Sequence, residues 1–105
     1  MELNFREKGR VPLRLSEEQI EAKLAAGGGW VREDGKWIVK KYRFRAFMDA
    51  IAFVNRVAEE AERLNHHPFI SIDYKLVTLR LMSWHAGGLT ELDFVAAEAF
   101  DRAAG

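Results

Sequence analysis

The chain has 105 residues, which is enough for one domain and too few for two. Its 16 basic and 16 acidic residues cancel, so the overall charge gives no reason to expect nucleic acid or an anionic membrane as a partner. The absence of cysteine excludes disulfides, thiolate catalysis and thiolate metal sites, and fits a reducing compartment. The sequence has neither an apolar run near the roughly 20 residues of a membrane span nor a signal-peptide pattern at its start. We therefore expect a cytoplasmic protein.

The first 44 residues predict an extension, a short helix and a β-hairpin. Residues 1–15 show no clear period, so we interpret them as an extension to a domain over 16–105. Ser16 to Gln19 form a capping box, and the helix that follows turns Ile20 and Leu24 inward before it stops at three glycines, 27–29. Two strands over 30–32 and 36–44 then flank Glu33-Asp34-Gly35, a strong hairpin signal.

A long helix is expected from Ala46 to about Asn65. A stripe of apolar residues recurs every three or four positions: Phe47, Ile51, Val54, Ala58, Ala61 and Leu64. Further apolar residues widen this stripe beyond what one sheet face should cover. Two explanations remain open: a deeply seated core helix, or a second apolar face buried between subunits. Pro68 ends the helix.

The remaining chain predicts two strands and a last helix. Residues 70–74 and 77–82 alternate between apolar and polar side chains, as half-buried strands do. Thr90 to Asp93 resemble another N-cap, which opens a helix through Phe100. The order α-β-β-α-β-β-α predicts an α+β domain with a single four-stranded antiparallel sheet and three helices on one face.

Histidines lead the candidates for proton transfer near neutral pH, and all three, His66, His67 and His85, flank expected strand ends. Glu62 lies four residues before His66 on one helical face, where it could orient the His66 ring. The alternative is that Asn65 to Pro68 are only a helix C-terminus, where histidines interact favourably with the dipole.

Other chemistries fit the sequence less well. Neighbouring histidines without a further spaced pair match zinc-ligand spacing poorly, so no metal site is expected. The three glycines precede a strand, whereas a phosphate-binding loop follows a strand and opens a helix. Nucleophilic catalysis lacks an obvious elbow or triad order.

The spacing of several residues resembles the signature of the pterin-4a-carbinolamine dehydratases. Its elements are Glu62, His66-His67-Pro68, Tyr74, Trp84 and Asp93, and the blocks at 64–68 and 87–93 look like the family's two most recognisable ones. The resemblance covers about residues 16 to 103. It implies removal of water from a 4a-hydroxytetrahydropterin, giving a quinonoid dihydropterin in tetrahydropterin recycling, without metal or organic cofactor.

The resemblance also assigns roles to residues. It implies that His66 and His67 supply general acid and base catalysis with Glu62 in support, and that Trp84, Asp93 and Tyr74 line the pterin site. Many members of the family carry a histidine where this chain has Trp84, and tryptophan cannot exchange a proton at neutral pH. His85 is a possible substitute, although adjacent strand residues face opposite sides.

Asp93 is interpreted in two ways: as the N3 residue that caps the last helix, and, from the resemblance, as a residue beside the pterin. The first is slightly favoured, and both can hold.

Two other functions stay open at this point. One is a dimerisation or protein-binding module, favoured by the wide apolar stripe of the long helix. The other is a pterin-binding protein without turnover, favoured by Trp84. We also expect a homodimer or homotetramer, because the outer strands of the sheet are open edges. Whether an aromatic amino acid hydroxylase works alongside the protein is not decided by the sequence.

Overall fold

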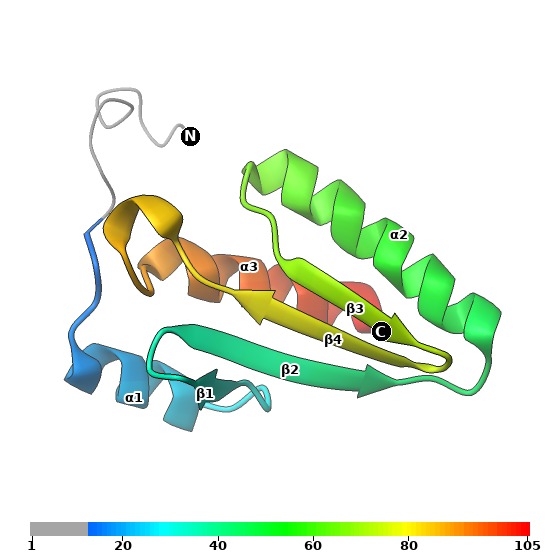
Figure 1. Cartoon of the computed structure of the whole chain (residues 1–105), viewed down its shortest axis with the longest axis horizontal. Coiled ribbons are helices and arrows are strands. Elements are labelled where there is room, and N and C mark those ends of the chain that lie inside the picture. Colours follow the sequence, from blue (N-terminus) through cyan, green and yellow to red (C-terminus); the bar gives the residue numbers. More distant parts are fainter. Residues whose placement is uncertain (1–12) are drawn as a thin grey trace.

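A computed structural model describes residues 13–105 of the chain as a four-stranded sheet and three α-helices (Figure 1). In chain order the elements are α1 (Glu17–Ala25), β1 (Val31–Glu33), β2 (Trp37–Arg43), α2 (Phe47–Leu64), β3 (Phe69–Asp73), β4 (Leu76–Leu81) and α3 (Glu91–Ala104). The strands are antiparallel in the order β1-β2-β4-β3. The predicted α+β class and the order α-β-β-α-β-β-α are confirmed. The extension predicted over residues 1–15 lies outside the described residues, except for its last three.

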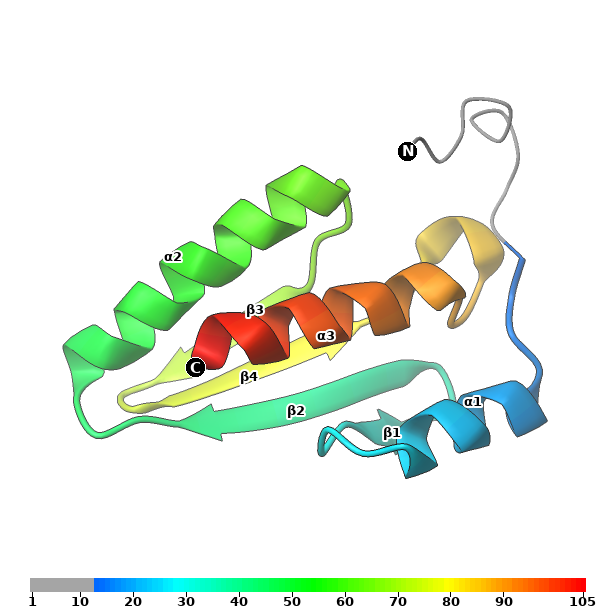
Figure 2. The ribbon, with the colours of Figure 1, turned by 180° about the vertical axis from the view of Figure 1, so that it is seen from behind.

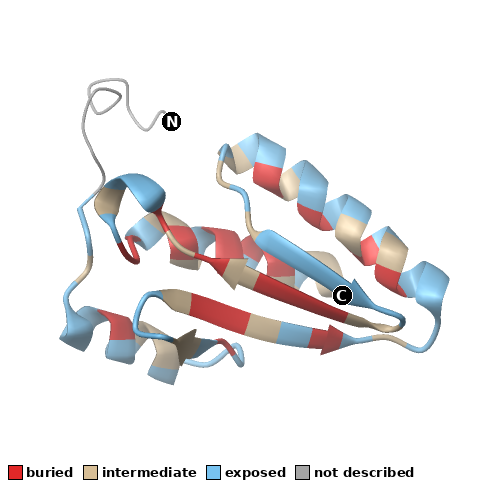
Figure 3. Cartoon of the chain, viewed as in Figure 1, coloured by how far each residue is buried: buried red, intermediate tan, exposed pale blue. Residues whose placement is uncertain are grey.

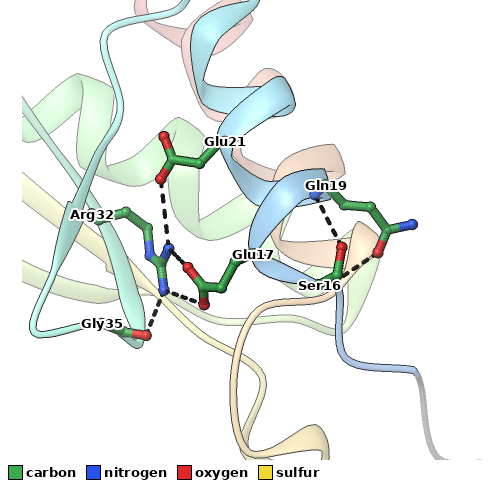
Figure 4. A network of polar contacts seen from close by, with 6 residues as sticks. All are labelled: Ser16, Glu17, Gln19, Glu21, Arg32 and Gly35. Atoms are coloured by element: carbon green, nitrogen blue, oxygen red, sulfur yellow. Dashed lines mark hydrogen bonds and ion pairs between the residues drawn. The ribbon is translucent and has the colours of Figure 1, made fainter.

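The start of α1 is fixed by the predicted capping box (Figure 4). The Ser16 hydroxyl accepts from the Gln19 amide at 3.1 Å, and the Gln19 side chain accepts from the Ser16 amide at 2.8 Å. Arg32 of β1 donates to Glu17 at 2.9 Å, which ties α1 to the first hairpin. The hairpin turns at Asp34 and Gly35, both with positive φ, and Glu33 belongs to β1 rather than to the turn.

The core lies between the helices and one face of the sheet (Figures 1 and 2). Register places Ile38 opposite Leu81 and Tyr42 opposite Val77, so these side chains share that face. They are buried together with Phe53 of α2 and Phe100 of α3. Of the strands, β2 and β4 carry most of the buried residues (Figure 3).

The buried stripe of α2 differs from the predicted one. It runs through Ala50, Phe53, Val57 and Ala61, whereas Phe47 and Ala58 of the predicted stripe are exposed. Met48 is also exposed, at 68%. Because apolar residues occupy more than one side of this helix, spacing alone did not reveal which side packs on the sheet. The helix is not deeply seated within one chain.

The edge strand β3 and the segment after β4 are the remaining parts of the fold. All five residues of β3 are exposed. β4 ends at Leu81, and Trp84–Ala86 form a 3-10 turn closed by Gly87 at φ 71°, so Trp84 and His85 are not adjacent strand residues as expected. No helix in the described part of the chain is long and apolar enough to cross a membrane.

Candidate functional site

The C-terminus of α2 sets the direction of the two histidines. Asn65 adopts a left-handed conformation (φ 53°, ψ 44°), and the His66 amide donates to the Ala61 carbonyl at 3.0 Å. This is a Schellman-type ending, in which the residue in the left-handed conformation reverses the chain. Asparagine tolerates that conformation better than most residues other than glycine. The reversal points His66 toward the N-terminus of α3 rather than along the axis of α2.

His66 contacts the carboxylate of Asp93, which other residues fix in place through hydrogen bonds. Its Nε2 lies 2.5 Å from Oδ1 of Asp93, and Asp93 is fully buried, with 0% of its surface exposed. The second oxygen, Oδ2, accepts from the Ser83 hydroxyl at 2.7 Å and from the Thr90 amide at 2.9 Å. Thr90 is the N-cap of α3, so Asp93 caps the helix and contacts His66 at the same time.

His67 has a carboxylate partner of its own. Its Nε2 lies 2.7 Å from Oε2 of Glu62, and both side chains are largely exposed. Glu62 was expected to orient His66 through the spacing of four residues on a helix. That expectation is wrong in this structure, because the left-handed Asn65 ends the helix before His66 and brings His67 back to Glu62 instead.

The two pairs give a consistent arrangement of ring nitrogens. Each imidazole is bound to its carboxylate through Nε2, and within the described residues neither Nδ1 has a hydrogen-bond partner. A carboxylate on one ring nitrogen fixes the tautomer and leaves the other nitrogen for proton exchange. Adjacent histidines held in this way can exchange protons with two atoms of one ligand.

Trp84 and His85 lie on the 3-10 turn that follows Ser83. Ser83 and Gly88 form an isolated bridge, with the Ser83 amide donating to the Gly88 carbonyl at 2.9 Å, so the loop is anchored at its base. Ser83 is itself buried against Asp93. Trp84 is 71% exposed. The tryptophan therefore projects from a loop whose neighbouring serine touches the His66–Asp93 pair.

Tyr74 lies apart from this cluster in the single chain. It occupies the turn between β3 and β4 with φ 58°, and its side chain is 68% exposed. It lies six positions after Pro68, which corresponds to about 20 Å along a strand at about 3.3 Å per residue. The structure thus brings together His66, His67, Glu62 and Asp93, and places Tyr74 at the far end of the β3–β4 hairpin.

Sequence reasoning missed Ser83, and no pattern around it could have identified it. A second polar cluster was missed as well. Asp101 of α3 accepts from Tyr42 at 2.5 Å, from Lys40 at 2.8 Å and from Trp30 at 3.2 Å. Burial, together with the hydrogen bond to Asp101, raises the pKa of Tyr42.

A cavity of about 360 Å³ lies beside this second cluster, between α1 and α3. Its walls include Lys23, Phe94 and Asp101, and none of the histidines. This cavity and the groups suited to proton transfer therefore lie in different places. We place the candidate site at the histidines, because the cluster around Asp101 consists of groups that already satisfy one another.

Metal binding is not supported by the described residues. Among residues 13–105, no three side chains of His, Asp or Glu gather closely enough to hold a metal ion. The carboxylates near the histidines are each engaged in hydrogen bonds to a ring nitrogen.

Comparisons with known proteins match the chain over most of its length. Residues 13–103 match the family model described as pterin 4 alpha carbinolamine dehydratase. A candidate pterin-4-alpha-carbinolamine dehydratase from Picosynechococcus is 43% identical, over 85% of this chain and 96% of that protein. One from Chloroflexus aggregans is 46% identical, over 88% and 98%.

Two solved structures have similar folds. The crystal structure of a transcriptional coactivator/pterin dehydratase from Brucella melitensis has a TM-score of 0.83 and 34% identity, over 88% of this chain and 99% of that one. A pterin dehydratase-like RuBisCO assembly factor of the alpha-carboxysome has a TM-score of 0.63 and 23% identity, over 73% and 90%, so it shows likeness of fold alone.

Proposed function

The chain belongs to the pterin 4 alpha carbinolamine dehydratase family, and on that premise we propose that it is a hydro-lyase acting on a 4a-hydroxytetrahydropterin. The reaction expels the 4a-hydroxyl as water and gives a quinonoid dihydropterin, a step of tetrahydropterin recycling. The observation that carries the proposal is the pair of adjacent imidazoles, each bound to a carboxylate through Nε2.

The chemistry requires one proton to be added and one to be removed. The 4a-hydroxyl leaves readily only after protonation, and a ring nitrogen of the pterin loses a proton as the C=N bond forms. A general acid and a general base each contribute about 10²–10⁴-fold to such a reaction. In the proposed site His66 and His67 divide these two roles through Nδ1, while Asp93 and Glu62 hold their rings.

Trp84 and His85 are proposed to contact the substrate. Both are exposed on the turn after Ser83, so their side chains can cover a ligand held at the histidines. The indole can stack on the flat pterin and donate a hydrogen bond, but it cannot carry a proton.

The direct test is the dehydration rate of a 4a-hydroxytetrahydropterin with the wild-type protein and with the variants His66→Ala, His67→Ala and Trp84→Phe. We expect a loss of about 10²–10⁴-fold for each histidine variant, and a smaller loss for Trp84→Phe. Circular dichroism checks that each variant is folded. Full acceleration in folded variants at both histidines would refute the catalytic assignment. Pterin binding without turnover in the wild-type protein would instead support a binding protein.

A second candidate function is a protein-binding module. The observation that favours it is the exposed apolar side of α2, with Met48 at 68% and Phe47 at 45% exposure. The Brucella relative is named a transcriptional coactivator as well as a pterin dehydratase. Substituting Met48 with Lys leaves the histidines untouched, so loss of self-association or partner binding with full dehydration activity would separate the two functions.

A further inference from the structure

The segment before α1 runs along the loop that follows β4 (Figures 1 and 2). This loop contains the turn Trp84–Ala86 and returns the chain to α3. The Leu15 amide donates to the Leu89 carbonyl at 2.8 Å, and Nη1 of Arg14 donates to the Gly87 carbonyl at 3.3 Å. Two consecutive residues before α1 are thus attached to the returning part of the loop.

Gly88 is buried, and the side chain of Arg14 passes over it. A Cβ at position 88 would lie 2.7 Å from Cδ of Arg14 and 3.3 Å from its Cγ, closer than carbon atoms pack. The backbone at Gly88 does not require glycine, because its φ is not positive, whereas Gly87 has a φ of 71°. The two adjacent glycines therefore meet different needs. Gly87 adopts a left-handed conformation, and Gly88 leaves room for the aliphatic part of Arg14.

Arg14 provides a donor that the turn itself lacks. Carbonyl groups at the end of a helical turn have no partner within the turn, and a cation interacts favourably with them. Gly87 closes the turn Trp84–Ala86, so the guanidinium binds at this end. A long cationic side chain can lie along the backbone while its charge stays in water. Arg14 therefore combines packing on Gly88 with a hydrogen bond to Gly87.

The loop is held at both of its ends. At the first end, the Ser83 hydroxyl donates to the buried Asp93 of the histidine site at 2.7 Å. At the other end, Arg14 holds Gly87. Among the residues that the structure describes, the backbone of the turn Trp84–Ala86 has hydrogen bonds only within its own loop. The position of the turn relative to the histidines therefore depends on both ends.

We propose that Arg14 is a positioning residue for the candidate site, because it fixes the turn that places Trp84 and His85 over the substrate. The role toward a substrate rests on the proposed dehydratase function, whereas the contact with the loop does not. Arg14 acts through the turn and leaves the histidine–carboxylate pairs in place. Its loss should therefore weaken substrate binding rather than proton transfer.

Two substitutions remove this contact from opposite sides. Arg14→Ala deletes the side chain, and Gly88→Ala places a methyl group where that side chain lies. Because an arginine side chain is flexible, the methyl group should displace it and leave the backbone in place. We expect each variant to raise the KM for a 4a-hydroxytetrahydropterin about fivefold, with kcat changed less than about twofold, since a hydrogen bond that orders the turn is lost. The double variant should raise KM no further, because both substitutions remove the same contact.

The pair of variants also separates position from charge. Gly88→Ala keeps the charge of Arg14, so equal effects of the two substitutions cannot come from a lost charge. Arg45→Ala is the matched control: it removes an exposed arginine before α2, at the opposite end of that helix from the histidines, and should leave KM unchanged. Urea denaturation checks that each variant is folded. A wild-type KM in either single variant, or effects that multiply in the double variant, would overturn the proposal.

The position of Trp84 can be followed without any activity. The chain has three tryptophans, so protein labelled with 5-fluorotryptophan gives a fluorine NMR signal for each, and Trp84→Phe identifies the one from Trp84. We expect Arg14→Ala and Gly88→Ala to shift this signal and to leave the other two in place, and Arg45→Ala to shift none. An unchanged Trp84 signal in both variants would overturn the proposal. An inactive wild-type protein in which the Trp84 signal shifts as expected would refute the dehydratase function and leave Arg14 as the residue that holds the turn.

Discussion

At the residue scale, Asp93 holds the candidate site together because one carboxylate serves three groups. One oxygen contacts His66, and the other accepts from the Ser83 hydroxyl and from the amide of Thr90, the N-cap of α3. A buried carboxylate needs such donors, since burying an unsatisfied charge is costly. Asp93 therefore caps α3 and contacts His66 with the same carboxylate.

Asp93→Asn tests whether the carboxylate orients His66. An amide can still accept from Ser83 and Thr90, but its NH₂ group then faces Nε2 and requires the opposite imidazole tautomer. We expect a fall in dehydration rate of about 10²–10⁴-fold and a loss of about 1–3 kcal/mol in unfolding free energy. Rate assays and urea denaturation measure the two effects. An unchanged rate would leave Asp93 with its capping role alone.

Ser83→Ala removes one of the two donors to the second oxygen of Asp93. Because the Thr90 amide remains, we expect a smaller rate loss than for Asp93→Asn, seen in kcat more than in KM. The unfolding free energy should fall by about 1–2 kcal/mol, since a buried acceptor loses a partner. The matched control is Thr78→Ala, a buried hydroxyl on β4 outside the site, which should lower stability without lowering kcat. Equal kcat losses in the two variants would contradict the positioning role.

The sequence pointed to the site residues but not to their pairing. The family resemblance named His66, His67 and Asp93, and the structure places these residues close together. The helical spacing assigned Glu62 to the wrong ring, since a left-handed residue such as Asn65 cannot be recognised from helical periodicity. Ser83 had no signal at all, because its importance lies in a contact with a residue ten positions away.

At the element scale, the ending of α2 controls where the histidines point. Asn65 is one of three non-glycine residues with positive φ among those described, and the only one of them at a helix end. The strands and helices themselves were predictable, since capping boxes, alternation and the Asp-Gly turn are local signals. The buried side of α2 was not, because Met48, Phe53 and Val57 add apolar residues to more than one side of the helix.

Substitutions at Asn65 separate backbone conformation from side-chain chemistry. Asn65→Ala must place a Cβ in the left-handed region, so we expect it to lower the unfolding free energy by about 1–2 kcal/mol. Asn65→Gly adopts the conformation without that penalty and should be as stable as the wild type or more so. Urea denaturation measures both, and the dehydration rate should follow the same order because His66 comes next. Equal stability of the two variants would mean that the left-handed turn is not under steric constraint.

At the scale of the whole molecule, the cluster around Asp101 joins α3 to β2 and to the segment before β1, two parts of the fold that the histidine site does not touch. Asp101 belongs to α3, Tyr42 and Lys40 to β2, and Trp30 to the segment before β1. Lys40 also donates to the Gly28 carbonyl, which fixes the glycine loop after α1. The last helix is thereby tied to the first hairpin, and the cluster contributes to stability rather than to proton transfer.

The hydrogen bond between Tyr42 and Asp101 predicts how the unfolding free energy depends on pH in the alkaline range. The pKa of Tyr42 is raised in the native state by burial and by Asp101, whereas in the unfolded chain tyrosine ionises near its ordinary pKa of about 10. Above about pH 10 the unfolded state releases a proton that the native state retains, so the unfolding free energy falls as pH rises. Below that pH the contribution of neutral Tyr42 is fully present.

Tyr42→Phe isolates this effect, because every other side chain is the same in the two proteins. At pH 8 the variant should be less stable by about 1–3 kcal/mol, since Asp101 loses a hydrogen bond from the hydroxyl. Between about pH 10 and 11 the wild type should lose stability more steeply than the variant, and the gap between them should narrow. Urea denaturation at each pH gives both curves. Parallel curves would show that the Tyr42 proton is not held more tightly in the folded protein, and that Asp101 and burial do not govern its titration.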